Sequence, residues 1–126
     1  MNLHTFIIIG RSGSGKGTQA KLLIEEIKRL DSSREVFYLE SGNKFREVLK
    51  SENFTAKIAR EIGNKGLLQP AFLAIHIWSH IFIENIKGTE HLIIDGTPRK
   101  LSEARIFADA LRFYNRPTPT ILNINV

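Results

Sequence analysis

A glycine-rich segment between an apolar run and an amphipathic stretch is the feature that most restricts how this chain can fold. The apolar run is Phe-Ile-Ile-Ile at positions 6–9, and Gly10 follows it directly. A continuous run of this kind is typical of a parallel strand covered on both faces, so we expect the central strand here. Apolar residues then recur at three- and four-residue spacing from Ala20 to Leu30, which predicts a helix with one apolar side. The order is therefore strand, glycine-rich loop, helix.

The loop itself reads Gly-Arg-Ser-Gly-Ser-Gly-Lys-Gly-Thr from Gly10 to Thr18. In this context it matches the phosphate-binding loop, or P-loop, whose glycines let consecutive backbone N–H groups turn toward phosphate oxygens. The N-terminus of the helix adds its dipole, and Lys16 adds a mobile positive charge. A glycine-rich turn without a ligand is the alternative, but such a turn requires neither repeated glycines nor a lysine at this place. The loop therefore predicts a site for a nucleoside triphosphate.

Further along the chain, apolar runs alternate with helical patterns. Strands are predicted at 36–39, 91–94 and 120–126, and helices at about 44–50, 55–62, 71–86 and 102–113, the last capped by Ser102. Strands that alternate with helices predict an α/β fold, an open parallel sheet with helices on both faces, in one domain over 1–126. The helix at 71–86 is apolar nearly all round, but its His, Ser and Glu residues favour a core helix over a membrane span.

Composition excludes several classes of protein. With 42% apolar and 25% charged residues, the chain has the balance of a globular domain with a core. It contains no cysteine, and its N-terminal apolar run is too short for a signal peptide, so we expect a cytoplasmic protein with no membrane partner. The net charge of +5 suits a polyanion, but Lys and Arg are scattered and no nucleic-acid-binding pattern emerges. His76 and His80 lack a third ligand in a recognised metal pattern and are interpreted as ordinary helix residues.

Four segments together resemble the adenylate kinase family. The first is Lys-Gly-Thr-Gln at 16–19, in which a glycine separates the lysine from the threonine, unlike the general P-loop pattern. The others are Ser-Gly-Asn-Lys-Phe-Arg at 41–46, Gly-Leu-Leu-Gln-Pro at 66–70 and Asp-Gly-Thr-Pro-Arg at 95–99. They are similar to the family's segments in order and spacing across nearly the whole chain. The resemblance implies the P-loop NTPase-type fold, with four strands visible, a fifth missing, and a helical monophosphate-binding insertion at 41–70.

The resemblance also implies phosphoryl transfer from ATP, with Mg²⁺, to a nucleoside monophosphate, AMP being the favoured acceptor, by a monomeric protein. Such catalysis depends on positioning and on neutralising charge rather than on covalent chemistry. On the donor side, the loop would hold the ATP phosphates, while the Thr18 hydroxyl and, through water, Asp95 would hold Mg²⁺. The donor-site residues implied are Gly10, Ser12, Gly13, Ser14, Gly15, Lys16, Gly17 and Thr18.

On the acceptor side, the resemblance assigns Arg46 and Arg99 to the α-phosphate, a task that suits the forked guanidinium group. With Lys16 they are the expected catalytic residues. Glu103 stands where family members commonly carry a glutamine that reads adenine. Because a carboxylate only accepts hydrogen bonds and so suits the paired donors of guanine, base preference stays open, as does a merely solvated Glu103. The acceptor-site residues implied are Ser41, Gly42, Arg46, Leu68, Gly96, Arg99 and Glu103.

Two alternatives to a complete kinase stay open from the sequence. Family members continue beyond the fourth strand with an arginine-bearing lid and a fifth strand, whereas this sequence ends at Val126. One alternative is a P-loop module that binds nucleotide without catalysis, and the other is a P-loop kinase for a different small molecule. Arg46 and the segment at 95–99 speak against the second. Without a lid to exclude water, the 126-residue chain by itself is expected to be poor or inactive as a kinase.

Lys16→Ala tests the P-loop assignment. Removing the ammonium group leaves the phosphates with neutral backbone donors, so ATP binding should weaken and any turnover should fall by orders of magnitude. Calorimetric titration with ATP measures the first effect. A variant that kept the full ATP affinity would contradict the assignment.

Overall fold

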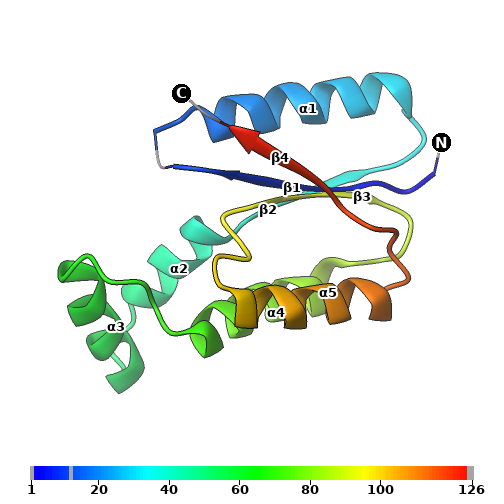
Figure 1. Ribbon diagram of the computed structural model, residues 1–126. Helices are drawn as coiled ribbons and strands as arrows, with labels where there is room; N and C mark the ends of the chain where they lie inside the picture. The colour runs from blue at the N-terminus through cyan, green and yellow to red at the C-terminus, as the bar shows by residue number, and fades with distance from the viewer. Residues whose placement is uncertain (1, 12, 125–126) are drawn as a thin grey trace.

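The computed structural model describes residues 2–11 and 13–124, in which one parallel sheet lies between two layers of helices (Figure 1). The strand order is β2-β3-β1-β4, and each neighbouring pair runs parallel. β1 therefore has a strand on either side, as the apolar run predicted. The expected strand at 120–126 is described as far as Ile124, and its last two positions lie outside the described residues. The strands are β1 (Thr5–Gly10), β2 (Val36–Glu40), β3 (His91–Asp95) and β4 (Thr120–Ile124).

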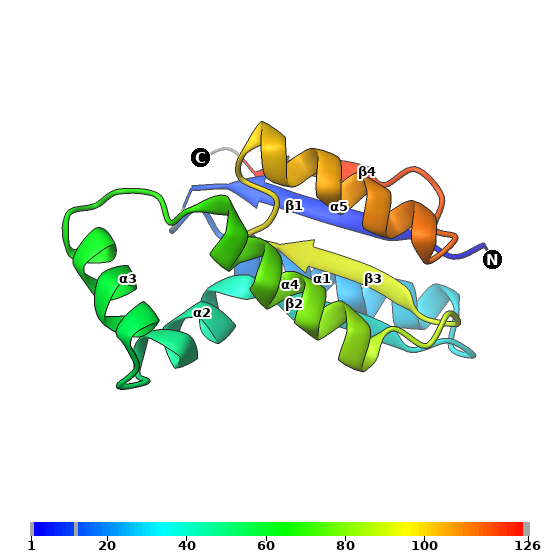
Figure 2. The same cartoon turned by 90° about the horizontal axis from the view of Figure 1, so that it is seen from below.

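The helices occupy both faces of the sheet and one of its ends. α1 (Lys16–Leu30) covers one face, and α4 (Ala71–Asn85) and α5 (Leu101–Phe113) lie side by side on the other (Figures 1 and 2). α2 (Ser41–Leu49) and α3 (Phe54–Asn64) extend beyond the end of the sheet where β2 finishes. The predicted α/β architecture is confirmed. That residues 41–70 act as a separate monophosphate-binding insertion stays a prediction.

Alternation along the strands explains why apolar runs are continuous in this sequence. Ile7 and Ile94 belong to the cluster formed with α4 and α5, whereas Ile8 and Ile93 belong to the cluster formed with α1. Successive side chains of a strand point to opposite faces, so a strand with helices on both sides requires apolar residues at every position. The same requirement accounts for the apolar middle of β3, Leu92 to Ile94, while the buried polar residues His91 and Asp95 lie at its two ends.

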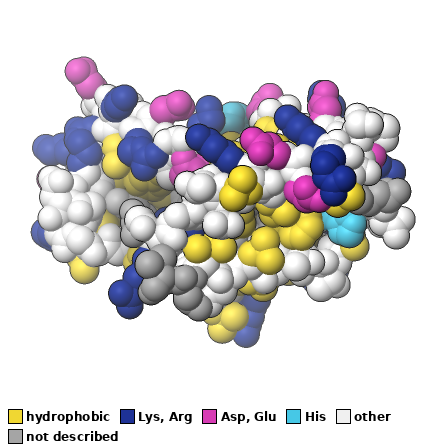
Figure 3. Space-filling view, turned by 90° about the horizontal axis from the view of Figure 1, so that it is seen from above, with side chains coloured by type: hydrophobic (Ala, Val, Ile, Leu, Met, Phe, Trp, Pro, Cys, Tyr) yellow, Lys and Arg dark blue, Asp and Glu magenta, His cyan; other side chains and the backbone are white. Residues whose placement is uncertain are grey.

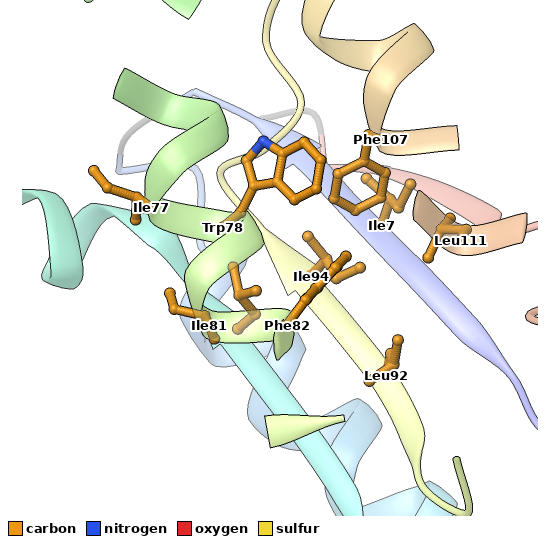
Figure 4. Close-up of a cluster of buried hydrophobic side chains, with 10 residues drawn as sticks. Ile7, Ile77, Trp78, Ile81, Phe82, Leu92, Ile94, Phe107 and Leu111 are labelled. Atoms are coloured by element: carbon orange, nitrogen blue, oxygen red, sulfur yellow. The ribbon is translucent and has the colours of Figure 1, made fainter. Parts of the chain in front are cut away.

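The larger core cluster lies between the sheet, α4 and α5. At its centre are the rings of Trp78, Phe82 and Phe107, whose centroids lie 4.9–5.5 Å apart in edge-on and tilted arrangements (Figure 4). α4 thus belongs to the core, as predicted, but only with one side, and it exposes Phe72 and Ile83 on the other although its sequence is apolar nearly all round. Among the described residues, no helix has both the length and the apolar character needed to cross a membrane.

The starts of α5 and α2 differ from the prediction for reasons that the structure shows. The expected cap at Ser102 is wrong: α5 begins one residue earlier, and the Glu103 carboxylate accepts the Arg99 N–H (3.2 Å) just before it. α2 begins at Ser41 rather than near residue 44. The reason is the Glu40 side chain, which accepts a hydrogen bond from the N–H of residue 43 (3.2 Å) and so caps the helix directly after β2.

Polar side chains close the opposite end of the sheet, at the amino ends of the strands. The buried His91 accepts a hydrogen bond at Nδ1 from the His4 N–H (3.0 Å), and its Nε2 lies 3.0 Å from Asp31 Oδ2. The hydrogen bond from His91, followed by one from Ser33, holds the pKa of Asp31 below its usual value. Arg116 donates to the His4 carbonyl (3.1 Å). These contacts fasten the strand starts to the segments that follow α1 and α5.

Phe82→Ala should lower the free energy of unfolding by about 3–5 kcal/mol, because it removes a ring that is 1% exposed from the middle of the core. Phe72→Ala, on the same helix but 66% exposed, should change it by no more than about 0.5 kcal/mol. Chemical denaturation followed by circular dichroism measures both values. Equal losses would contradict the placement of α4 in the structure.

Candidate functional site

The carboxyl ends of β1, β2 and β3 meet at one edge of the sheet, the place where ligands bind in open α/β folds. A cleft of about 990 Å³ opens there. The glycine-rich loop, the first turn of α1, the start of α2 and the segment after β3 form its walls. The fold therefore brings segments that are far apart in the sequence to one place.

Left-handed backbone shapes the glycine-rich loop. Gly13 has φ +81° and Gly15 has φ +94°, angles that residues with side chains rarely adopt. α1 then begins at Lys16, and its N-cap makes no side-chain hydrogen bond within the described part of the chain. The N–H groups of its first turn are therefore available to an anion in the cleft.

Most of the predicted donor-site residues line this cleft. The Ser14 hydroxyl is buried within the loop and has no hydrogen-bond partner among residues 2–11 and 13–124, so the described residues leave its donor capacity unused. Ser12 lies outside the described residues. The cleft-lining members of the predicted set are Gly10, Gly13, Gly15, Lys16, Gly17 and Thr18.

Lys16 and Asp95 face each other in the cleft. The Lys16 Nζ lies 3.4 Å from Asp95 Oδ1, and Asp95 is only 5% exposed. The second carboxylate oxygen, Oδ2, accepts a hydrogen bond from the Tyr38 hydroxyl (2.8 Å). Burial, followed by this hydrogen bond to Asp95, raises the pKa of Tyr38 well above its usual value. The phenol therefore stays protonated and remains a hydrogen-bond donor.

Oxygen ligands for a cation are present beside the loop. Thr18 at the start of α1 and Asp95 at the end of β3 both line the cleft. Hydroxyl and carboxylate oxygens suit Mg²⁺, which is usually bound by few protein groups together with water and phosphate oxygens. These residues fit Mg²⁺ that arrives with a phosphate chain. In the part of the chain that the structure describes, no cluster of three or more His, Asp or Glu residues could hold a metal ion by itself.

Positive charge is concentrated in the cleft. Its lining includes two carboxylates, Glu40 and Asp95, against a larger set of cations: Arg11, Lys16, Lys21, Arg46 and Arg99. On the face of the molecule shown in Figure 3, Lys and Arg side chains are instead interspersed with Asp and Glu. A low-dielectric cleft lined mainly by one sign of charge attracts ions of the other sign. The site therefore favours a polyanion such as a phosphate chain.

A second cavity, of about 270 Å³, adjoins the cleft between α2, α4 and the start of α5. Phe45, Ala74 and Ile77 contribute apolar walls. Arg46 and Arg99 line both cavities, so ligands in the two would meet at these guanidinium groups. The predicted acceptor-site residues all line it: Ser41, Gly42, Arg46, Leu68, Gly96, Arg99 and Glu103.

The two arginines are held differently. Arg46 has 65% of its side-chain surface exposed and lies 3.7 Å from a Glu40 carboxylate oxygen. Arg99 Nε donates to the Gly96 carbonyl (2.9 Å).

Gly96 has φ +92°, and a Cβ there would lie 2.8 Å from the Ser41 hydroxyl. Glycine at this position is what lets the end of β3 approach the start of α2.

Glu103 is 2% exposed, so its interpretation as a solvated charge is wrong. One carboxylate oxygen accepts a hydrogen bond from the Thr97 hydroxyl, and the other accepts the Arg99 N–H (3.2 Å). The carboxylate thus joins α5 to the segment that follows β3. It also forms part of the wall of the smaller cavity.

Tyr38 and Glu40 line the cleft but were not singled out from the sequence. Both lie on the same face of β2, two residues apart, at the end where the strand meets α2. Polar groups at the end of an apolar strand were the available signal. These groups can be assigned to the cleft only once β2 is known to pair with β3, and a sequence pattern does not reveal that pairing.

Comparison with known proteins gives a family and a set of relatives. A family model described as "AAA domain" matches residues 9–124. The chain is 33% identical to an adenylate kinase of Azobacteroides pseudotrichonymphae genomovar. CFP2 over 94% of its own length and 58% of that protein. It is 31% identical to an adenylate kinase of Parabacteroides distasonis over 95% of its length and 59% of the relative. Human adenylate kinase isoenzyme 5 is 32% identical over 79% of the chain and 16% of that protein.

Glu103→Leu should lower the free energy of unfolding by about 1–3 kcal/mol, because it leaves the buried Thr97 hydroxyl without its acceptor. Glu84→Leu, at an exposed position of α4, is the control and should have little effect. Urea denaturation at neutral pH compares the two variants. A fully stable Glu103→Leu variant would show that the carboxylate does not join these two segments.

Proposed function

Because this chain belongs to the AAA-domain family and is similar to adenylate kinases over most of its length, we propose that it transfers a phosphoryl group from ATP to AMP. The chain spans 58% and 59% of the two bacterial relatives, so the activity of those proteins is carried over as a proposal. The observation that carries it is the meeting of two cavities at Arg46 and Arg99. A donor and an acceptor need adjoining sites whose phosphate ends face each other.

The larger cleft is proposed for ATP. Backbone N–H groups of the loop and of the first turn of α1 would receive the phosphate oxygens, and the Ser14 hydroxyl, which has no partner among the described residues, would add a donor. The Lys16 ammonium would turn from Asp95 toward the terminal phosphates. Thr18 and Asp95 would hold Mg²⁺, which when bound neutralises charge on those oxygens.

The smaller cavity is proposed for AMP. Its apolar walls suit a base, while Arg46 and Arg99 at its mouth suit the monophosphate. Ser41, Gly42 and Leu68 would surround the nucleoside. Both Glu103 oxygens already accept hydrogen bonds within the protein, so they are less available to the paired donors of guanine. The similarity to adenylate kinases is the separate reason for proposing AMP.

Transfer between these sites needs little covalent assistance. An oxygen of the acceptor phosphate is already ionised, so it can bond to the terminal phosphorus of ATP without a general base. The bond between that phosphorus and the bridging oxygen breaks, and ADP forms on both sides. The cations Lys16, Arg46 and Arg99 would stabilise the charge that spreads over the transferred group.

Formation of ADP from radiolabelled ATP tests the proposal directly. AMP, GMP, CMP and UMP are offered separately, with Lys16→Ala as the background. We expect slow transfer above that background, in keeping with the poor activity expected of the 126-residue chain, with AMP giving the highest kcat/KM. A chain that binds ATP and AMP but transfers nothing to any of the four acceptors would contradict the proposal.

Arg46→Ala and Arg99→Ala should each weaken AMP binding by about 1.5–3 kcal/mol, the scale of one hydrogen bond to a charged group, and leave ATP affinity nearly unchanged. Arg105→Ala, an exposed arginine of α5, is the matched control. Calorimetric titration with each nucleotide separately gives the two affinities. Loss of ATP affinity with AMP affinity intact would reverse the assignment of the two cavities.

A further inference from the structure

The Tyr38 hydroxyl donates to Asp95 at the floor of the larger cleft, with 2.8 Å between the two oxygens. Parallel pairing of β2 with β3 creates this contact. Tyr38 is opposite Ile93 in the register, and Asp95 is two residues beyond Ile93 on the same face of the sheet. Both side chains therefore lie on the face that α1 covers.

Packing fixes the position of the phenol. The Tyr38 ring lies against the cluster of Ile8, Ala20, Ile27 and Ile93, which joins the sheet to α1. Tyr38 is partly buried, and the contact of its ring with this cluster limits how far the hydroxyl can shift. The hydrogen bond thus orients the carboxylate of Asp95 relative to the sheet. While the bond is present, the carboxylate cannot rotate freely.

The second oxygen of Asp95 is the one that matters for a ligand. Oδ1 lies 3.4 Å from the Lys16 Nζ, and both groups line the cleft. If Lys16 moves to a phosphate chain, a carboxylate free to rotate could follow the ammonium with both oxygens. The contact from Tyr38 to Oδ2 opposes that rotation and leaves Oδ1 facing the cleft.

We propose that Tyr38 is a positioning residue for the cation that accompanies ATP, acting through the orientation of Asp95. This inference rests on the proposed function only in taking Mg²⁺ with ATP as the ligand. Asp95 is expected to hold Mg²⁺ through water, so Tyr38 would belong to the outer shell of the site, where the loss of a partner commonly changes metal affinity by about 10- to 100-fold. The phenol would therefore set the Mg²⁺ concentration at which the nucleotide binds tightly.

The test is the Mg²⁺ dependence of ATP binding by the full chain. Calorimetric titrations with ATP are made in EDTA and at a series of MgCl₂ concentrations for the unmodified protein, Tyr38→Phe and Tyr114→Phe. Tyr38→Phe keeps the packed ring and removes only the hydroxyl. We expect it to raise the Mg²⁺ concentration for the half-maximal gain in affinity by about tenfold and to leave ATP affinity in EDTA unchanged.

Tyr114→Phe is the matched control, since Tyr114 is the only other tyrosine and packs against the core cluster beneath α4 and α5. It should leave the Mg²⁺ dependence unchanged. A double-mutant cycle supplies the mechanism: if Tyr38 acts through Asp95, Tyr38→Phe should have no further effect in an Asp95→Asn background. Thermal unfolding of all variants checks that the fold is retained.

The outcomes separate this inference from the proposed function. Equal Mg²⁺ dependence in Tyr38→Phe and the unmodified protein would overturn the role of Tyr38 and leave phosphoryl transfer to AMP in place. An undiminished effect of Tyr38→Phe in the Asp95→Asn background would also overturn it. Failure to transfer phosphate to any acceptor would overturn the proposed function, while the binding titrations would still decide the role of Tyr38.

Discussion

Parallel pairing between β1 and β3 is the constraint on which the site depends. In this register Ile8 is opposite Asp95, so the chain leaves both strands at the same edge of the sheet. The glycine-rich loop and the segment after β3 are then neighbours, although more than seventy residues separate them in the sequence. Lys16 reaches Asp95 only because of this pairing. A different strand order would leave the loop with its helix dipole but without the carboxylate.

The two faces of the sheet contribute differently to this arrangement. On one face, α1 carries the end of the loop and packs its apolar side against Ile8 and Ile93. On the other face, the aromatic core holds α4 and α5, and α5 in turn holds the segment after β3 through Glu103. The proposed donor site is thus supported from one side of the sheet and the proposed acceptor site from the other. Burial of apolar surface holds the helices on both faces, and the polar contacts at the edge then orient the side chains of the two sites.

Local patterns were enough to predict the loop, the α/β class and the approximate positions of the helices and strands. Each of these follows from periodicity or from a short motif, which needs no knowledge of distant contacts. Tyr38 and the buried state of Glu103 could not be predicted in this way, because they depend on which strand lies beside β3 and on how α5 docks. The start of α5 was predicted wrongly from Ser102 for a related reason: the carboxylate of Glu103, one residue later, accepts the hydrogen bond from the Arg99 N–H just before the helix.

The junction between β2 and α2 has a mechanical consequence. Glu40 ends the strand and Ser41 begins the helix, so no flexible linker separates them, and the Glu40 side chain locks the first turn. Arg46 therefore lies on a helix whose orientation relative to the sheet is fixed at its first turn. The opposite wall of the smaller cavity is different, because Leu68 lies in the irregular, largely exposed stretch 65–70. A bulkier ligand in the smaller cavity would be accommodated by movement of this wall. The stretch before α4 would thus set the width of the cavity, whereas the sheet would set the distance between Arg46 and Arg99.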